Sequence, residues 1–63
     1  MDRTKTGALI AAARKEQNMT QKELAAALHV SDRAVSKWER GAGFPDISLL
    51  EPLAAALGVS VLE

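Results

Sequence analysis

Apolar residues recur every three to four positions along most of the chain, a spacing that predicts α-helices with one buried face. The first helical stretch runs from about Thr4 or Thr6 to Gln17, and Asn18 is its expected stop. Strands are not expected, because only 6 of the 63 residues are Ile or Val.

A second helix is expected from Gln21 to about Leu28, because a capping box precedes it. Thr20 can bond the backbone amide of Glu23, whose carboxylate can reach back to the amide of Thr20. Met19 and Leu24 occupy the two positions of a hydrophobic staple around this start.

Ser31 is the expected cap of a third helix, which runs from Asp32 to about Arg40 and stops at Gly41. Only His29 and Val30 separate it from the second helix. Two short helices joined by so tight a turn predict a helix-turn-helix unit over about residues 20–40.

A fourth helical segment is expected over residues 47–57, with Asp46 as its cap and Gly58 as its end. Pro52 lies inside the segment and cannot donate a backbone hydrogen bond. We therefore expect a kink, or a short first turn with the regular helix starting near Glu51.

LAAALHVS at residues 24–31 is nearly repeated as LAAALGVS at residues 53–60. Both strings encode the same local event, a helix end followed by a tight turn and a serine cap. Ser60 should therefore cap a fifth helix. Because the sequence ends three residues later, we expect that helix to be truncated and the chain to be part of a longer protein.

Composition supports a single all-α domain over residues 1–63. The 63 residues include 12 Ala and 8 Leu against 6 Ile and Val, and no Cys, so neither disulfides nor thiolate metal sites can stabilise the fold. No apolar run approaches the roughly 20 residues that span a bilayer, and the first residues lack the order of a signal peptide. These features predict a soluble, cytoplasmic protein.

The net charge is zero but is unevenly distributed. Residues 1–41 contain all 8 basic residues and 5 acidic ones, a net charge of +3, whereas residues 42–63 contain 3 acidic residues and no basic one. This asymmetry allows a basic face on a neutral protein.

The motifs along the chain are similar to those of one known family. They are Gly7, Ile10 and Arg14 in the first helix, TQKELA at residues 20–25, VS at 30–31, VSKWERG at 35–41, PDI at 45–47 and LAAALGVSV at 53–61. With these motifs the chain resembles the XRE family, the lambda-repressor and Cro-like DNA-binding domains of bacterial and phage regulators. The resemblance implies a compact bundle of four to five short helices. It also implies that the third helix enters the major groove of double-stranded DNA, with a homodimer on a two-fold operator or a monomer in this short form.

The third helix should present one polar face to DNA, because Val35 and Trp38 take its core positions. The base-reading candidates on that face are Arg33, Lys37, Ser36 and Asp32. Arginine and lysine have donors for guanine edges, and serine can serve as donor or acceptor. The acid could accept from a cytosine amino group, but we favour a role in stabilising the helix start, worth about 0.3–1 kcal/mol.

Four further residues are candidates for contacts with phosphate. Gln21 stands at the first position of its helix, where free amides and the positive helix end attract an anion. Ser31, Lys22 and Arg40 are the other three. For each charged candidate, a solvated surface charge is an equally good interpretation.

The family resemblance also pairs Arg14 with Glu39 in a partly buried salt bridge, which makes Glu39 structural. The sequence departs from the family at His29, where glycine is usual, so this residue should need a positive φ. A second departure is the loop at residues 42–45, which lacks the basic residues of some relatives.

The sequence argues against catalysis, because one His and scattered carboxylates assemble no nucleophile, base and orienting group. No metal or other cofactor is expected. The main alternative to DNA binding is a protein-interaction module, such as the helix-turn-helix half of an antitoxin. Arg33 and Lys37 argue against it, since an acidic or apolar third helix would suit that role better.

Overall fold

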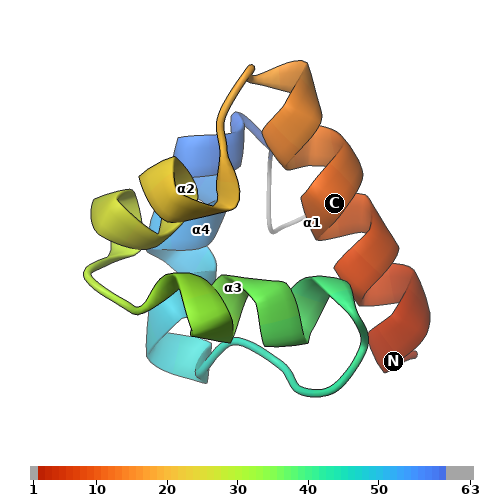
Figure 1. Ribbon diagram of the computed structural model, residues 1–63. Helices are drawn as coiled ribbons and strands as arrows, with labels where there is room; N and C mark the ends of the chain where they lie inside the picture. Colours follow the sequence, from red (N-terminus) through yellow and green to blue (C-terminus); the bar gives the residue numbers. More distant parts are fainter. Residues whose placement is uncertain (1, 60–63) are drawn as a thin grey trace.

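The computed structural model describes residues 2–59, which form four α-helices and one short 3-10 helix (Figure 1). The helices are α1 (Arg3–Glu16), α2 (Gln21–Leu28), α3 (Asp32–Glu39) and α4 (Leu50–Leu57), and the 3-10 helix η1 (Ile47–Leu49) precedes α4. The described residues contain no strand, which confirms the all-α prediction. The predicted fifth helix from Ser60 lies outside them. Among these helices none is long and apolar enough to cross a membrane.

The first helix, α1, begins at Arg3, earlier than the predicted start at Thr4 or Thr6. The side chain of Asp2 caps this helix by accepting from the backbone amides of Thr4 at 2.8 Å and Lys5 at 3.4 Å. The other end agrees with expectation, because Asn18 takes a φ of 57° just beyond the helix. A short polar residue tolerates this left-handed conformation better than most.

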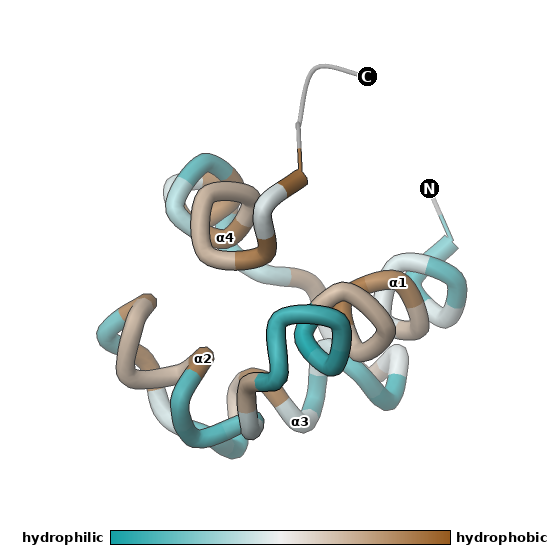
Figure 2. Tube along the Cα trace, turned by 90° about the horizontal axis from the view of Figure 1, so that it is seen from above, coloured by the Kyte–Doolittle hydropathy of each residue, from teal (hydrophilic) through white to brown (hydrophobic). Residues whose placement is uncertain are grey.

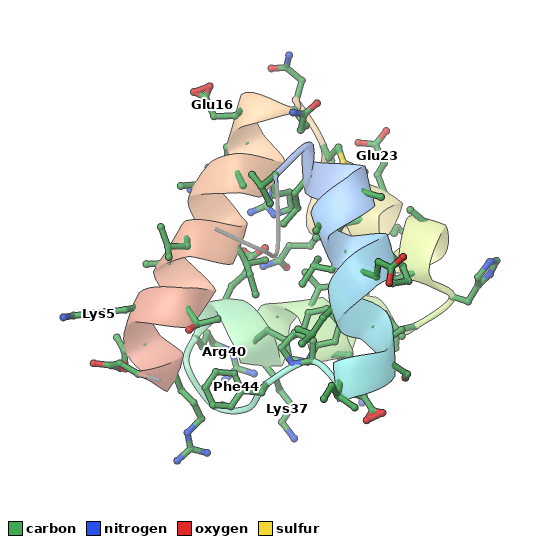
Figure 3. All side chains as sticks on the ribbon, turned by 180° about the vertical axis from the view of Figure 1, so that it is seen from behind. Lys5, Glu16, Glu23, Lys37, Arg40 and Phe44 are labelled. Carbon is green, nitrogen blue, oxygen red and sulfur yellow. The ribbon has the colours of Figure 1, made fainter. Side chains whose placement is uncertain are left out.

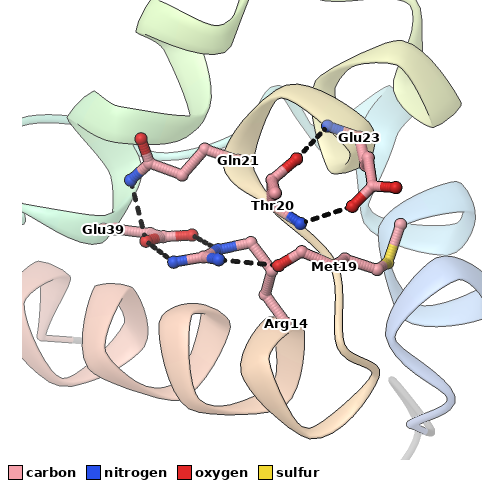
Figure 4. A network of polar contacts seen from close by, with 6 residues as sticks. All are labelled: Arg14, Met19, Thr20, Gln21, Glu23 and Glu39. Atoms are coloured by element: carbon pink, nitrogen blue, oxygen red, sulfur yellow. Dashed lines mark hydrogen bonds and ion pairs between the residues drawn. The ribbon is translucent and has the colours of Figure 1, made fainter.

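The predicted capping box at the start of α2 is confirmed. The Thr20 hydroxyl accepts from the Glu23 amide at 3.0 Å, and the Glu23 carboxylate accepts from the Thr20 amide at 2.8 Å (Figure 4). His29 ends the helix with a φ of 58°, the positive value expected at a position where the family usually has glycine. Ser31 then caps α3 by accepting from the Ala34 amide at 3.2 Å.

The fourth segment consists of a short first turn and a regular helix, as predicted, but its predicted cap is wrong. Residues 47–49 form the 3-10 turn, and α4 begins at Leu50, so Pro52 falls in the first turn, where a missing N–H costs no bond within the helix. The Asp46 side chain caps no backbone amide and instead accepts from the Ser48 hydroxyl at 3.1 Å. Gly58 ends α4 with a φ of 69°, as expected.

The helices enclose one hydrophobic core to which all four contribute. Leu24 of α2 and Val35 of α3 are fully buried at its centre. Around them lie Ile10, Ala25, Leu28, Trp38, Leu53 and Leu57. Both α1 and α2 pack against α3, and α4, whose trace is the most apolar, contacts α1 and α2 (Figure 2). The core therefore holds α2 and α3 together as the helix-turn-helix unit.

The backbone of α1 approaches the end of α3 closely at Gly7. A Cβ atom at this position would overlap the carbonyl oxygen of Trp38 and lie 2.9 Å from that of Glu39. Only glycine therefore fits where α1 crosses α3. This crossing sets the distance between α1 and the last turn of the third helix.

Candidate nucleic-acid interface

The outer face of α3 is polar along its whole length. Val35 and Trp38 are buried against the core, and Ser36 is half-buried. The exposed residues of the face are Asp32, Arg33, Lys37 and Arg40. Figure 3 shows Lys37 extending away from the body of the molecule. The base-reading candidates therefore share one helix surface, on which three of them are exposed and Ser36 is half-buried.

Ser36 and Arg40 lie one helical turn apart on this face and are hydrogen-bonded. The Arg40 Nε donates to the Ser36 Oγ at 3.3 Å. This contact uses one acceptor position of the hydroxyl and leaves its proton available to donate. It also leaves the two terminal nitrogens of the Arg40 guanidinium for other acceptors, consistent with its assignment as a phosphate candidate.

The start of α2 lies beside the last turn of α3, so the phosphate candidates adjoin the base-reading face. The half-buried Gln21 donates from Nε2 to the Glu39 Oε1 at 3.0 Å. Lys22 and Ser31 are exposed, and Ser31 retains a hydroxyl proton after accepting the capping bond from Ala34. Gln21, Lys22, Ser31 and Arg40 therefore come from three chain segments around the ends of α2 and α3.

Arg14 and Glu39 form the ion pair that joins α1 to the end of α3 (Figure 4). The Arg14 Nε lies 2.7 Å from the Glu39 Oε2, and its Nη2 lies 3.0 Å from Oε1, a two-pronged contact. The Arg14 Nη1 also donates to the carbonyl of Met19 at 2.8 Å. The side chains of Arg14 and Glu39 are only 11% and 7% exposed.

These contacts shift the titration of both partners. Burial disfavours the charged form of Glu39, but the hydrogen bonds from Arg14 and Gln21 and the charges of Arg14 and Lys15 outweigh it, so the pKa of Glu39 lies below its ordinary value. The hydrogen bond to Glu39, helped by the carboxylate's charge, raises the pKa of Arg14 despite some burial. Both groups are therefore charged near neutral pH.

Sequence reasoning missed two of these contacts. Nothing in the local pattern signals that Gln21 reaches Glu39, because the two residues are 18 positions apart and on different helices. The bond from Arg14 to the Met19 carbonyl was also missed. The Arg14–Glu39 ion pair, by contrast, was expected from the family resemblance.

The residues between 2 and 59 hold no cluster of three potential metal ligands. His29 is exposed in the turn between α2 and α3, where its conformation is set by the helix end.

Comparisons with known proteins agree with this geometry. The helix-turn-helix family matches residues 10–63. The HTH-type transcriptional activator BcrR of Enterococcus faecalis is 40% identical over 50 residues, which cover 79% of this chain and 24% of that protein. The chain thus spans about a quarter of the length of this curated relative.

Two solved structures share the fold over nearly the whole chain. The clp gene regulator ClgR of Corynebacterium glutamicum is 35% identical with a TM-score of 0.88, covering 98% of this chain and 80% of that one. The restriction-modification controller protein C.Esp1396I, a tetramer in complex with its natural 35 base-pair operator, is 30% identical with a TM-score of 0.79. The match covers 95% of this chain and 79% of that one.

Proposed function

The chain belongs to the helix-turn-helix family, which confirms the resemblance to the XRE regulators, and from this premise we propose that it is a sequence-specific DNA-binding domain of a bacterial-type transcriptional regulator. The observation that carries the proposal is the polar outer face of α3, which presents Arg33 and Lys37. The start of α2 lies beside the C-terminal end of this helix, where Gln21 bonds Glu39. An α-helix fits the major groove, where arginine and lysine can bind guanine edges.

The proposed role of each residue in DNA binding follows from the position of its side chain. Arg33, Lys37 and Ser36 read base edges from α3, and Asp32 stabilises the start of that helix or accepts from cytosine. Gln21, Lys22, Ser31 and Arg40 bind phosphates on either side of the groove. The Arg14–Glu39 pair holds α1 against the reading helix.

Residues 1–63 act in this proposal as one non-catalytic domain in the cytoplasm. Two copies bind a two-fold operator, each placing α3 in a major groove, with half-sites about 34 Å apart. The operator complex of the similar C.Esp1396I tetramer supports assembly of this kind.

The experiment is selection of binding sites from random duplexes, followed by affinity measurements on the selected and a scrambled site. Arg33→Ala and Lys37→Ala should each lose about 1–3 kcal/mol on the selected site and relax the preference at particular base pairs. Lys5→Ala is the matched control, because Lys5 is an exposed cation on the outer side of α1 (Figure 3). If both α3 variants keep the full ratio of selected to scrambled affinity, α3 is not the reader.

A salt titration by fluorescence anisotropy tests the binding mode separately. The logarithm of the association constant should fall with the logarithm of salt concentration, with a slope of about −0.9 per phosphate contacted. A flat titration, or a selection that returns no common sequence, would favour the protein-interaction module instead.

A further inference from the structure

We propose that Glu39 is a positioning residue for DNA binding. Its carboxylate fixes the orientation of the Gln21 carboxamide, so that this carboxamide donates a hydrogen bond to a DNA phosphate. Arg14 compensates the negative charge of Glu39. The inference rests on the proposed function. It assigns to an acidic residue of the reading helix a role in binding, beyond the structural ion pair.

The geometry at Glu39 makes its carboxylate a shared acceptor. Its Oε1 accepts from the Arg14 Nη2 and the Gln21 Nε2, both at 3.0 Å, while its Oε2 accepts from the Arg14 Nε at 2.7 Å (Figure 4). An ionised carboxylate is an acceptor only, so the Gln21 side chain can face it with its NH2 group and not with its carbonyl oxygen. The carboxylate therefore selects one of the two flip states of the carboxamide.

The selected state matters for an anion. One N–H of Gln21 is held by Glu39, and the second N–H remains available as a donor at the start of α2. A flipped carboxamide would turn its carbonyl oxygen toward Glu39 and lose the bond, and a freely rotating one would spend part of its time presenting that oxygen to the phosphate. Fixing the group in advance avoids the cost of ordering it on binding.

Arg14 makes an acid tolerable at this place. An unpaired carboxylate near DNA would repel the phosphates, whereas the two-pronged contact with Arg14 compensates its charge. Arg14 is itself held by the Met19 carbonyl at 2.8 Å, directly before the capping box of α2. With 7% of its side chain exposed, Glu39 acts on DNA through Gln21 and not by direct contact.

The test is a double-mutant cycle on duplex affinity with Gln21→Ala, Glu39→Gln and the double variant, measured where circular dichroism shows each to be fully folded. Loss of one hydrogen bond to a charged phosphate should weaken Gln21→Ala about tenfold. Glu39→Gln should lose a similar factor, because its own carboxamide no longer selects one flip state of Gln21. The double variant should bind no more weakly than Gln21→Ala alone. Losses that multiply would overturn the proposal, since a purely structural Glu39 acts independently of Gln21.

Two controls separate charge from positioning. Glu16→Gln removes the same charge from an exposed site on α1, which points away from the body of the molecule in Figure 3, and should leave the affinity near that of the wild type. Arg14→Gln combined with Glu39→Gln restores neutrality without the carboxylate and should remain weakened. Recovery of full affinity by that pair would show that the unpaired Arg14, and not the missing carboxylate, causes the loss in Glu39→Gln, and would contradict the proposal.

A measurement without DNA keeps this inference distinct from the proposed function. In the NMR spectrum of the free wild-type protein, the Gln21 side-chain amide proton that Glu39 accepts should exchange with water more slowly than its partner proton, and the two should be well separated in chemical shift. Glu39→Gln should remove both properties. An unprotected Gln21 amide in the wild type would overturn the inference, even if Glu39→Gln did not fold. If the wild type binds no duplex while the amide is held, the proposed function fails and so does the role of Glu39 in binding.

Discussion

Replacing Gly7 by alanine adds one Cβ atom, which has two opposite effects on the stability of the fold: higher helix propensity and steric overlap with α3. Alanine favours a helix interior over glycine by about 1 kcal/mol, so propensity alone predicts a more stable protein. In the structure, however, the added Cβ would overlap the Trp38 carbonyl oxygen, and it would lie 2.9 Å and 3.0 Å from the carbonyl oxygen and carbon of Glu39. These are backbone atoms at the end of α3, which cannot rotate out of the way.

The magnitude follows from the required movement. Normal contact distances of about 3.5–4.0 Å are restored only if α1 moves from α3 by about an ångström. Overpacking of this kind typically costs about 1–3 kcal/mol, and here the shift also pulls Arg14 away from Glu39. Weakening this ion pair should cost about 1 kcal/mol more and so offset the gain in helix propensity, and we expect Gly7→Ala to destabilise the fold by about 1–3 kcal/mol. In a domain of this size, each kcal/mol lowers the Tm by about 4–8 °C.

Thermal and urea unfolding followed by far-UV circular dichroism measure the effect. Ala8→Gly is the matched control, because Ala8 is the exposed neighbour of Gly7 in α1 and should lose only the helix propensity of about 1 kcal/mol. The sign of the change in unfolding free energy for Gly7→Ala shows whether overlap with α3 or helix propensity dominates. A Tm equal to or above that of the wild type would refute the close approach of α1 and α3 as the reason for glycine here.

Three further measurements test the Arg14–Glu39 ion pair and the capping box at the start of α2. Arg14→Met and Glu39→Gln should each cost about 3 kcal/mol in urea melts, because each leaves a largely buried partner uncompensated, and losses below about 1 kcal/mol would mean a surface contact. Because the folded pKa of Glu39 is lowered, its stabilising contribution should be complete above the unfolded carboxyl pKa of about 4.3 and be lost as pH falls through the lower folded value. Stability measured against pH should show this acid loss in the wild type and a smaller one in Glu39→Gln. Thr20→Ala should cost about 1 kcal/mol by removing the capping box, whereas Thr20→Ser should retain most of the stability; equal losses would contradict the capping role.

The local features of this protein could be read from short stretches of sequence. Two caps illustrate this, the capping box at Thr20 and the serine cap at Ser31. Each depends on residues within four positions of one another, so local backbone geometry specifies its contacts. The polar face of α3 followed in the same way from helical periodicity. Asp2 is also a local cap, but Thr4 and Thr6 are capping residue types too, so the local sequence does not single out the start of α1. The positive φ of His29 was expected from the family resemblance instead.

Contacts between distant segments were decided by the tertiary structure. The bond from Gln21 to Glu39 and the fit of Gly7 against α3 depend on how the helices cross, and no spacing within one helix encodes that crossing. Asp46 shows the same limit at short range, because the 3-10 turn after it directs its side chain to Ser48. The sequence by itself determined the starts of α2 and α3 and the ends of all four helices, since capping and periodicity act over a few residues. Only packing of the shared core determined which side chains meet, because burial of apolar surface is not directional and the crossing must satisfy all four helices at once.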